Sequence, residues 1–268
     1  MKKHSLTYRT ILIQVILSVL AVIWLYPLVQ SLIQSLRLDG FNNYVSVLEN
    51  PQINYLRVLM NSLLISVAVT LMVLILATLA GYAFSRMTFR FKDVIYFSLL
   101  ACLSLPPVAV MSPLFFTVKQ LGLMNTYASI ILPVIAFQAP FILLLVKNYF
   151  DQIPDSLMEA AEIDGASSFR TLFAVVVPVG LPVIINGAAL TFINSWNEFF
   201  LPLLFLRDSD KYTIPLTANY YMSTMNQTPR MVAQMYAALI LMTIPSIVVY
   251  VVAQRHLHSG LTAGAEKA

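Results

Sequence analysis

The sequence predicts an all-α integral membrane protein with six transmembrane helices, and two observations carry this prediction. First, 59% of the 268 residues are apolar, 10% are charged and the mean hydropathy is +0.80, whereas soluble domains carry about 25% charged residues. Second, six runs contain no charged residue, and each exceeds the roughly 20 residues that a helix needs to cross a hydrocarbon core of about 30 Å. The runs are Thr10–Leu36, Val58–Ser85, Val94–Val118, Gln120–Val146, Thr171–Asn197 and Met231–Gln254.

These runs place the spans within a single transmembrane domain that covers residues 1–268. We expect the spans at approximately residues 11–35, 59–84, 94–117, 124–147, 182–206 and 231–254. Pro178 and Pro182 mark the entry to the fifth span, which continues past Glu198. The first uncharged run has 27 residues, which is too long for the apolar region of a cleaved signal peptide, about 7–15 residues. We therefore interpret the first segment as a retained span.

The basic residues predict that both termini are cytoplasmic, since cytoplasmic loops carry an excess of Lys and Arg. Ten of the 16 basic residues then lie on the cytoplasmic side and six outside. The cytoplasmic ones are Lys2, Lys3, Arg9, Arg86, Arg90, Lys92, Lys147, Arg170, Arg255 and Lys267. The formal net charge of +4 is ordinary for such a protein, and it requires no nucleic acid as a partner.

Several sequence features argue against an enzyme and against a bound metal or cofactor. The sequence contains no Gly-Lys pair and hence no phosphate-binding GxxxxGK[ST] loop, so ATP hydrolysis must belong to another polypeptide. All three histidines lie outside the spans, which leaves no plausible nucleophile–base pair. His256 and His258 have no third ligand nearby and indicate a solvated tail. The single cysteine, Cys102, excludes an intrachain disulfide and suits a small packing residue.

The cytoplasmic loop 151–178 begins with signals for a short helix. Pro154 suits a first helical turn, and Ser156 with Glu159 has the spacing of a capping box. Gly165 is expected to end this helix, because glycine adopts the left-handed conformation without a Cβ penalty. The loop therefore predicts a short helix that is followed by a sharp corner.

A second helix follows the corner and leads into the fifth span. Ser167 can cap its start, and it runs until Pro178. The first helix carries an acidic face, whereas helices that lie on lipid usually carry Lys or Arg. The acidic residues are Asp155, Glu159, Glu162 and Asp164. The alternative of an interfacial helix on lipid is thus less favourable than a protein partner.

The spacing of this loop resembles the EAA loop of ABC-importer permeases. The matching pattern is Glu159-Ala160-Ala161, three residues, Gly165, nine residues, Val175, one residue and Val177-Pro178. Valines replace the more usual isoleucine and leucine. Three further stretches resemble the carbohydrate-uptake branch, which is typified by the smaller permease of the maltose transporter. They are Asn61-Ser62 with Gly81-Tyr82-Ala83-Phe84-Ser85-Arg86, then Trp196-Asn197-Glu198-Phe199, and then Gly260-Leu261-Thr262-Ala263-Gly264-Ala265.

This resemblance implies the six-helix bundle of the type I ABC-importer permease class. Residues 151–178 are then its coupling loop, whose EAA helix is held in a cleft of an ATPase. The implied coupling residues are Glu159, Ala160, Ala161, Asp164, Gly165 and Ala166. Residues 255–268 form a cytoplasmic tail that is implied to reach between the ATPase subunits. Its implied docking residues are Gly260, Leu261, Thr262 and Gly264.

The resemblance also implies the partners and the location. A second, different permease completes the pathway, two ATP-binding cassette subunits bind ATP and Mg, and an extracytoplasmic solute-binding protein delivers a sugar or related polyhydroxy solute to the loop Asp208–Arg230. The lipid bilayer is the cytoplasmic (inner) membrane of a bacterium or archaeon.

The fifth span contains a polar group that is a candidate for lining the pathway. Asn194, Asn197 and Glu198 have i, i+3, i+4 spacing and are expected on one face, beside Trp196. A carboxylate at membrane depth is costly and indicates function by default, and interhelical hydrogen bonding is the main alternative. Two other functions remain open: a proton-coupled secondary carrier that uses Glu198, and a membrane scaffold that docks an ATPase without transport.

Overall fold

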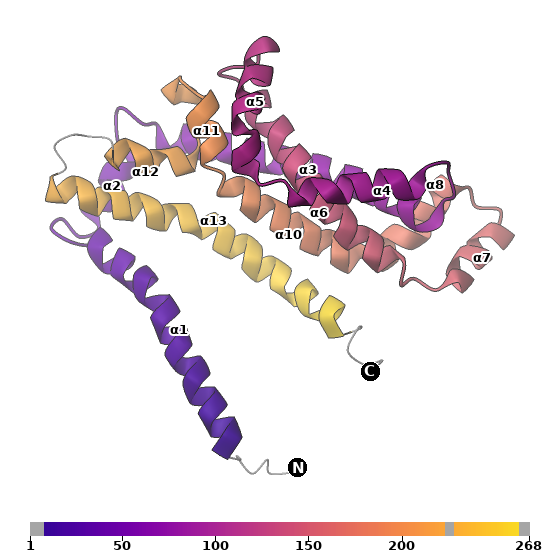
Figure 1. Ribbon diagram of the computed structural model, residues 1–268. Helices are drawn as coiled ribbons and strands as arrows, with labels where there is room; N and C mark the ends of the chain where they lie inside the picture. The colour runs from indigo at the N-terminus through magenta and orange to yellow at the C-terminus, as the bar shows by residue number, and fades with distance from the viewer. Residues whose placement is uncertain (1–7, 223–227, 263–268) are drawn as a thin grey trace. The chain divides into compact units, whose positions relative to one another are not determined.

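The computed structural model describes residues 8–222 and 228–262, and all its regular elements there are helical (Figure 1). Within those ranges four helices are individually long and apolar enough to cross a membrane, and two bent helix pairs raise the number to six if each pair is one span. The four are α1 (Tyr8–Ser35), α3 (Tyr55–Arg86), α6 (Ala128–Phe150) and α13 (Pro229–Thr262). The all-α membrane fold predicted from hydropathy is confirmed.

The chain divides into two compact units. The first comprises residues up to Tyr55 together with Thr217–Thr243. It contains α1, α2 (Asn42–Leu48), most of α12 (Ile214–Met222) and the beginning of α13. The buried Asn43 side chain holds the turn after α1, because its Nδ2 donates to the carbonyls of Ser35 at 3.0 Å and Arg37 at 2.8 Å.

The second unit comprises Leu56–Leu216 together with the residues from Ile244 onward, and α6 lies at its centre. This helix packs against α4 (Lys92–Ala101), α10 (Leu181–Trp196) and α11 (Phe200–Phe205). The surrounding lipid is as apolar as the core, so close van der Waals packing holds these helices together. Small residues permit that closeness: a Cβ on Gly81 of α3 would lie 2.9 Å from Val146 Cγ1 of α6.

Two spans of the second unit are broken rather than straight. The first break separates α4 with η1 (Cys102–Ser104) from α5 (Pro107–Gln120), with a bend of 103°. Pro106 and Pro107 explain it, since a residue before proline is pushed into the extended region, and both Leu105 and Pro106 are extended there. Pro107 then suits the first position of α5.

The second break, of 77°, separates α8 (Ser168–Thr171), the π-helix η2 (Leu172–Val176) and α9 (Val177–Val179) from α10. Gly180 is the joint. A Cβ there would lie 2.5 Å from Cε1 of the fully buried Phe150 and 2.9 Å from the Val176 carbonyl oxygen. Only glycine permits this approach of the joint to the end of α6.

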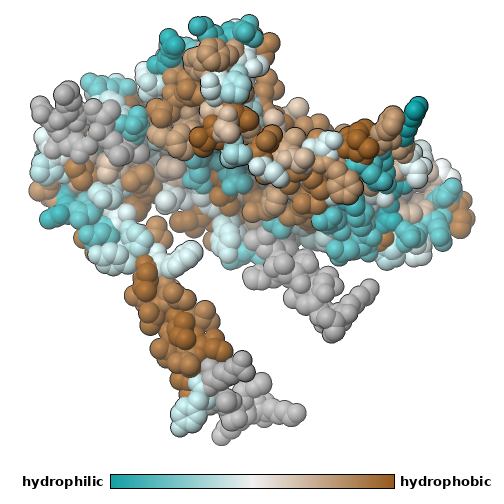
Figure 2. Space-filling view, viewed as in Figure 1, coloured by the Kyte–Doolittle hydropathy of each residue, from teal (hydrophilic) through white to brown (hydrophobic). Residues whose placement is uncertain are grey.

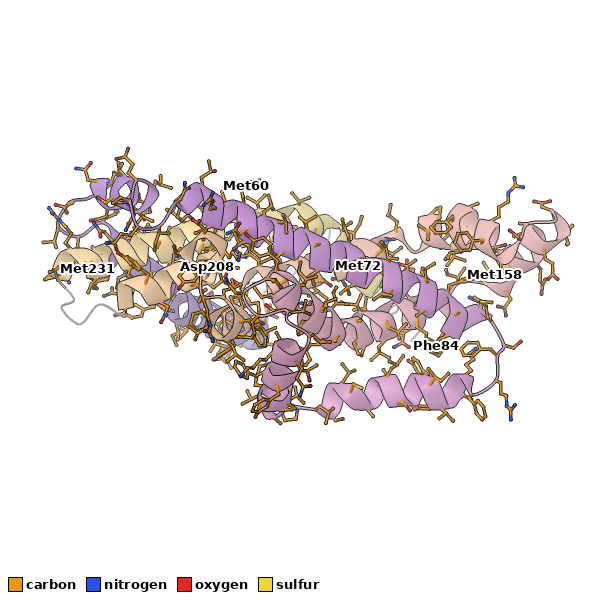
Figure 3. All side chains as sticks on the ribbon, turned by 90° about the horizontal axis from the view of Figure 1, so that it is seen from above. Met60, Met72, Phe84, Met158, Asp208 and Met231 are labelled. Atoms are coloured by element: carbon orange, nitrogen blue, oxygen red, sulfur yellow. The ribbon has the colours of Figure 1, made fainter. Side chains whose placement is uncertain are left out.

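The second unit has two distinct ends. In Figure 3, Phe84 and Met158 lie toward one end, whereas Met60 and Asp208 lie toward the other. The first is called the α7 end, after α7 (Asp155–Ile163), and the second the Asp208 end. Figure 2 shows hydrophilic side chains gathered at the α7 end and hydrophobic ones along α1.

Candidate functional site

The helix α7 begins at Asp155, directly after an extended Pro154 that occupies the N-cap position. No side chain caps this end. The predicted capping box of Ser156 and Glu159 is therefore wrong, because the helix begins one residue before Ser156. Proline suits this position because its missing N–H removes one of the unpaired donors of the first turn.

The corner after α7 follows the glycine prediction. Gly165 has φ +72° and so lies in the left-handed region. The Gly165 N–H donates to the Glu162 carbonyl, and the Ala166 N–H donates to the Ala161 carbonyl, both at 2.9 Å. These two bonds form a Schellman motif, which satisfies carbonyls at the end of the helix. A Cβ on Gly165 would meet nothing within 4 Å, so its backbone conformation explains why glycine is needed here.

The second helix starts as the sequence predicts. Ser167 is the N-cap of α8, and its Oγ accepts from the Arg170 N–H at 3.4 Å. The chain then continues through η2 and α9 to Gly180, slightly beyond the predicted end at Pro178. The local signals of the loop thus give a helix, a glycine corner and a second helix.

The exposed side of this corner combines acidic and apolar side chains. Ala161 is buried at 7% exposure and Ala166 is half-buried, while Glu159, Ala160, Asp164 and Gly165 are exposed. Two large apolar side chains are also exposed, Ile163 at 85% and Phe169 at 67%. We call Glu159, Ala160, Ile163, Asp164, Gly165 and Phe169 the α7 surface.

Neither Ile163 nor Phe169 is among the residues that the sequence pattern singles out. Apolar residues in the most charged loop of the chain are the signal that identifies them.

Arg86, the last residue of α3, connects to the beginning of α7. Its Nη1 lies 2.5 Å from Asp155 Oδ1. Its Nη2 donates to the Phe150 carbonyl at 2.6 Å and to the Ile153 carbonyl. The arginine side chain is only 13% exposed. In the sequence, Arg86 ends the stretch Gly81–Arg86 that carries part of the family resemblance, and this stretch predicts no role for Arg86 in holding α7.

The candidate pathway residues do not share one helical face. The helix α10 ends at Trp196, and Asn197 is its C-cap, so Glu198 lies beyond the helix. The Asn197 side chain donates to the Ile193 carbonyl at 2.8 Å. Asn194 is exposed. The expected i, i+3, i+4 face is therefore wrong at its last position.

Glu198 has a local structural partner. Its Oε1 accepts from the Leu201 N–H at 3.0 Å, at the beginning of α11. Trp196 also differs from the expectation, since it is only 1% exposed and its ring stacks on Phe192 with centroids 5.7 Å apart. A side chain buried within its own subunit does not line a pathway, so Trp196 is a core residue.

The predicted tail residues are only partly described. Gly260, Leu261 and Thr262 lie in the last turn of α13, and Gly264 lies outside the described residues. Within residues 8–222 and 228–262, no cluster of three or more His, Cys, Asp or Glu has metal-binding geometry.

Helices of membrane-spanning length, two broken spans and a polar corner at one end are the features of an integral membrane protein. The chain belongs to the family described as binding-protein-dependent transport system inner membrane components, which it matches over residues 74–263. It is 33% identical over 261 residues to the trehalose/maltose transport system permease protein of Thermococcus litoralis, covering 92% of this chain and 93% of that one.

Other relatives and solved structures agree. The trehalose transport system permease protein of Mycobacterium tuberculosis is 31% identical over 228 residues, covering 85% of this chain and 82% of that one. A chain of a bacterial ABC transporter that imports the acidic polysaccharide alginate has the same fold, with a TM-score of 0.80 at 24% identity, covering 95% of this chain and 98% of that chain. The protein is therefore a permease subunit of an ABC importer and not an enzyme.

Proposed function

We propose that this permease carries a sugar, and that an ATP-binding cassette subunit docks on the α7 surface to drive it. The observation that carries the docking proposal is the exposed corner itself, with Glu159 and Asp164 beside the apolar Ile163 and Phe169. Carboxylates at a membrane surface are repelled by anionic headgroups and attracted by arginine or lysine of a protein. The apolar side chains supply the contact area that a docked protein excludes from water.

The sugar proposal draws on the relatives. The names of three of them specify trehalose or maltose, diacetylchitobiose, and trehalose. All of these are uncharged disaccharides rich in hydroxyl groups. We propose that the solute of this permease is an oligosaccharide of the same size class.

A second permease is proposed from the surface of α1. None of the most apolar part of this 28-residue helix is buried within the chain. An apolar helix that its own subunit leaves uncovered can contact lipid on one side and a neighbouring membrane subunit on the other. Two ATP-binding cassette subunits, an extracytoplasmic solute-binding protein and a cytoplasmic membrane with both termini inside complete the proposed assembly.

Co-purification tests the docking proposal. Tagged wild-type chain from gently solubilised membranes is expected to carry an ATP-binding cassette protein, and Glu159→Lys is expected to lose it. Glu49→Lys is the matched control, since Glu49 is an exposed glutamate in the first unit, just after α2. Equal recovery of the ATPase with Glu159→Lys and Glu49→Lys contradicts docking on α7.

Uptake tests the solute class. Cells that express the complete transporter are given radiolabelled maltose, trehalose or diacetylchitobiose in turn. Accumulation that depends on this chain and on ATP supports the proposal. Failure of all three, with an assembled transporter present, contradicts the proposed size class.

A further inference from the structure

The helix α3 is bonded at both of its ends to segments that the proposed transport cycle uses. At the Asp208 end, the buried Asn61 side chain donates to the carbonyls of Asp210 at 2.9 Å and Tyr212 at 3.0 Å. Its Oδ1 accepts from the Tyr127 hydroxyl at 2.7 Å. The next residue, Ser62, accepts the Ile214 N–H at 2.8 Å. One turn of α3 therefore holds the segment 207–214.

The segment 207–214 is fixed on a second side by Asn125. The Asn125 Oδ1 accepts the N–H groups of Arg207 at 3.0 Å and Asp208 at 3.2 Å, and its Nδ2 donates to Asp208 Oδ2 at 2.7 Å. The bond from Asn125, aided by Lys211, holds the pKa of Asp208 below its usual range, so this carboxylate is charged at neutral pH. Within the second unit, the segment is thus held by hydrogen bonds both to α3 and to Asn125.

At the α7 end, Arg86 makes the corresponding connection. Its guanidinium joins the carbonyls of Phe150 and Ile153 to the carboxylate of Asp155, the first residue of α7. The Arg86 Nε is buried without a hydrogen-bond partner among the described residues. The two terminal nitrogens bind Asp155, Phe150 and Ile153, which is a fork geometry that lysine cannot reproduce.

Between these two connections α3 is continuous. Asn61 and Arg86 are 25 residues apart in one helix without proline, which corresponds to about 37 Å. Val69 and Val73, midway along it, are fully buried. The spans α4–α5 and α8–α10 are bent by 103° and 77°, and α6 contains Pro133 and Pro140. Of these elements, α3 is the one that is both a single helix and free of proline.

We propose that α3 is a strut that transmits displacement of α7 to the segment 207–214 on the far side of the membrane, with Arg86 and Asn61 as its positioning residues. This inference rests on the proposed docking of an ATPase on the α7 surface. When the docked ATPase moves α7, Asp155 pulls on Arg86 and the whole of α3 follows. The segment 207–214 then changes its position or exposure in step with the nucleotide state.

A cysteine reporter in the assembled transporter tests this proposal. The native thiol is removed with Cys102→Ser, and Ser209→Cys places one thiol in the exposed part of the segment. The rate of labelling by a membrane-impermeant charged maleimide is measured without nucleotide and after trapping with MgATP and orthovanadate. Coupling between sites typically alters an equilibrium about 5- to 150-fold, so the two rates are expected to differ by about five-fold or more.

The positioning residues are tested in that background. Arg86→Lys and Asn61→Ala are expected to bring the ratio of the two rates to one while the ATPase still co-purifies. Arg90→Lys is the matched control, because Arg90 is exposed and contacts the ring of its neighbour Phe91. It should retain the full ratio. If Arg86→Lys does not assemble, Asp155→Asn removes the ion pair from the other side and is expected to reduce the ratio.

The outcomes separate this inference from the proposed function. Suppose that the two labelling rates differ as much in Arg86→Lys and Asn61→Ala as in the unmodified reporter, but become equal in Glu159→Lys. This result overturns the strut and leaves the docking proposal standing. A ratio of one in the unmodified reporter background, with the ATPase docked and trapped, also overturns the strut. An unchanged ratio and unchanged docking in Glu159→Lys overturn the proposed function itself.

Discussion

Gly165 illustrates how much one residue determines in this protein. Its φ of +72° is a conformation that costs an L-residue about 1–2 kcal/mol. Because a Cβ there would meet nothing within 4 Å, a substitution strains the backbone without disturbing intrachain packing. A substitution at this position therefore strains the backbone but meets no neighbouring atom of the chain.

We predict that Gly165→Ala weakens recovery of the ATP-binding cassette subunit while the chain still inserts in the membrane. Gly40→Ala is the matched control, because Gly40 has φ +60° and equally open surroundings but lies outside the second unit. Both variants carry similar strain, so only loss of docking distinguishes them. Quantitative co-purification measures it, and equal recovery from both variants would falsify the special role of the corner.

Glu198, a charged residue within an apolar part of the chain, has a structural role in the helix that follows it. Its Oε1 accepts the Leu201 N–H at the start of α11, so it satisfies a backbone donor that would otherwise be unpaired in an apolar environment. Replacing a side chain that caps a helix costs about 1 kcal/mol. Glutamine retains an acceptor oxygen at this position but carries no charge.

We predict that Glu198→Gln transports nearly as well as wild type, and that Glu198→Ala transports less because it loses the hydrogen bond. The measurement is uptake of whichever of maltose, trehalose and diacetylchitobiose the transporter accumulates, normalised to the amount of protein in the membrane. A secondary carrier that cycles a proton on Glu198 requires the ionisable group. Abolished uptake in Glu198→Gln, with normal expression, would bring that alternative forward.

At the scale of elements, hydropathy predicts the membrane spans, and local sequence signals predict most of the helix ends and turns. Uncharged runs predict that spans exist, because the thickness of a bilayer sets their length. The glycine corner and the Ser167 cap are also predictable, since each depends on residues within a few positions. Ser156 fails as a cap because the helix begins earlier, at a residue that Arg86 holds from another element.

The bends could not be predicted in the same way. Prolines 106 and 107 indicate a break, but an angle of 103° depends on how α4 and η1 pack against α6. The end of α10 at Trp196 lies among the polar residues Asn194, Ser195, Asn197 and Glu198, and no glycine or proline stands between Gly187 and Pro202. No glycine or proline therefore places this end in the sequence. In the structure the Asn197 side chain donates to the Ile193 carbonyl there, and the Leu201 N–H donates to Glu198 Oε1.

We predict a graded loss of stability along the joint between α6 and its neighbours. Gly180→Ala forces a Cβ to 2.5 Å from the Phe150 ring, whereas Gly187→Ala places one 3.2 Å from Ile142 Cγ2. Overpacking typically costs about 1–3 kcal/mol, and the fully buried Phe150 has no room to move. Gly180→Ala should lower the melting temperature of the purified complex clearly more than Gly187→Ala; the reverse order would contradict the tight joint.

At the scale of the whole molecule, this subunit leaves much apolar surface uncovered. Large apolar side chains along α1 are 43–79% exposed between Ile11 and Leu28. Lipid covers such a surface without any specificity, and a second permease covers one face of it with close packing. The two situations differ in their angular pattern, since a protein neighbour occupies one side of a helix with about 3.6 residues per turn.

We predict that α1 contacts the second permease along one face. A photo-crosslinking amino acid is placed at each position from Ile16 to Ile23 in turn, and the membranes are irradiated and analysed for an adduct with the mass of two permeases. Because lipid and protein faces alternate around the helix, adducts should recur about every 3.6 residues, and the silent positions between them serve as internal controls. Adducts at no position, with all variants assembled and photoreactive, would show that α1 is surrounded by lipid and would remove the present support for a second permease. Adducts at every position would instead mean that α1 is enclosed by protein, and the proposed lipid-facing side would be wrong.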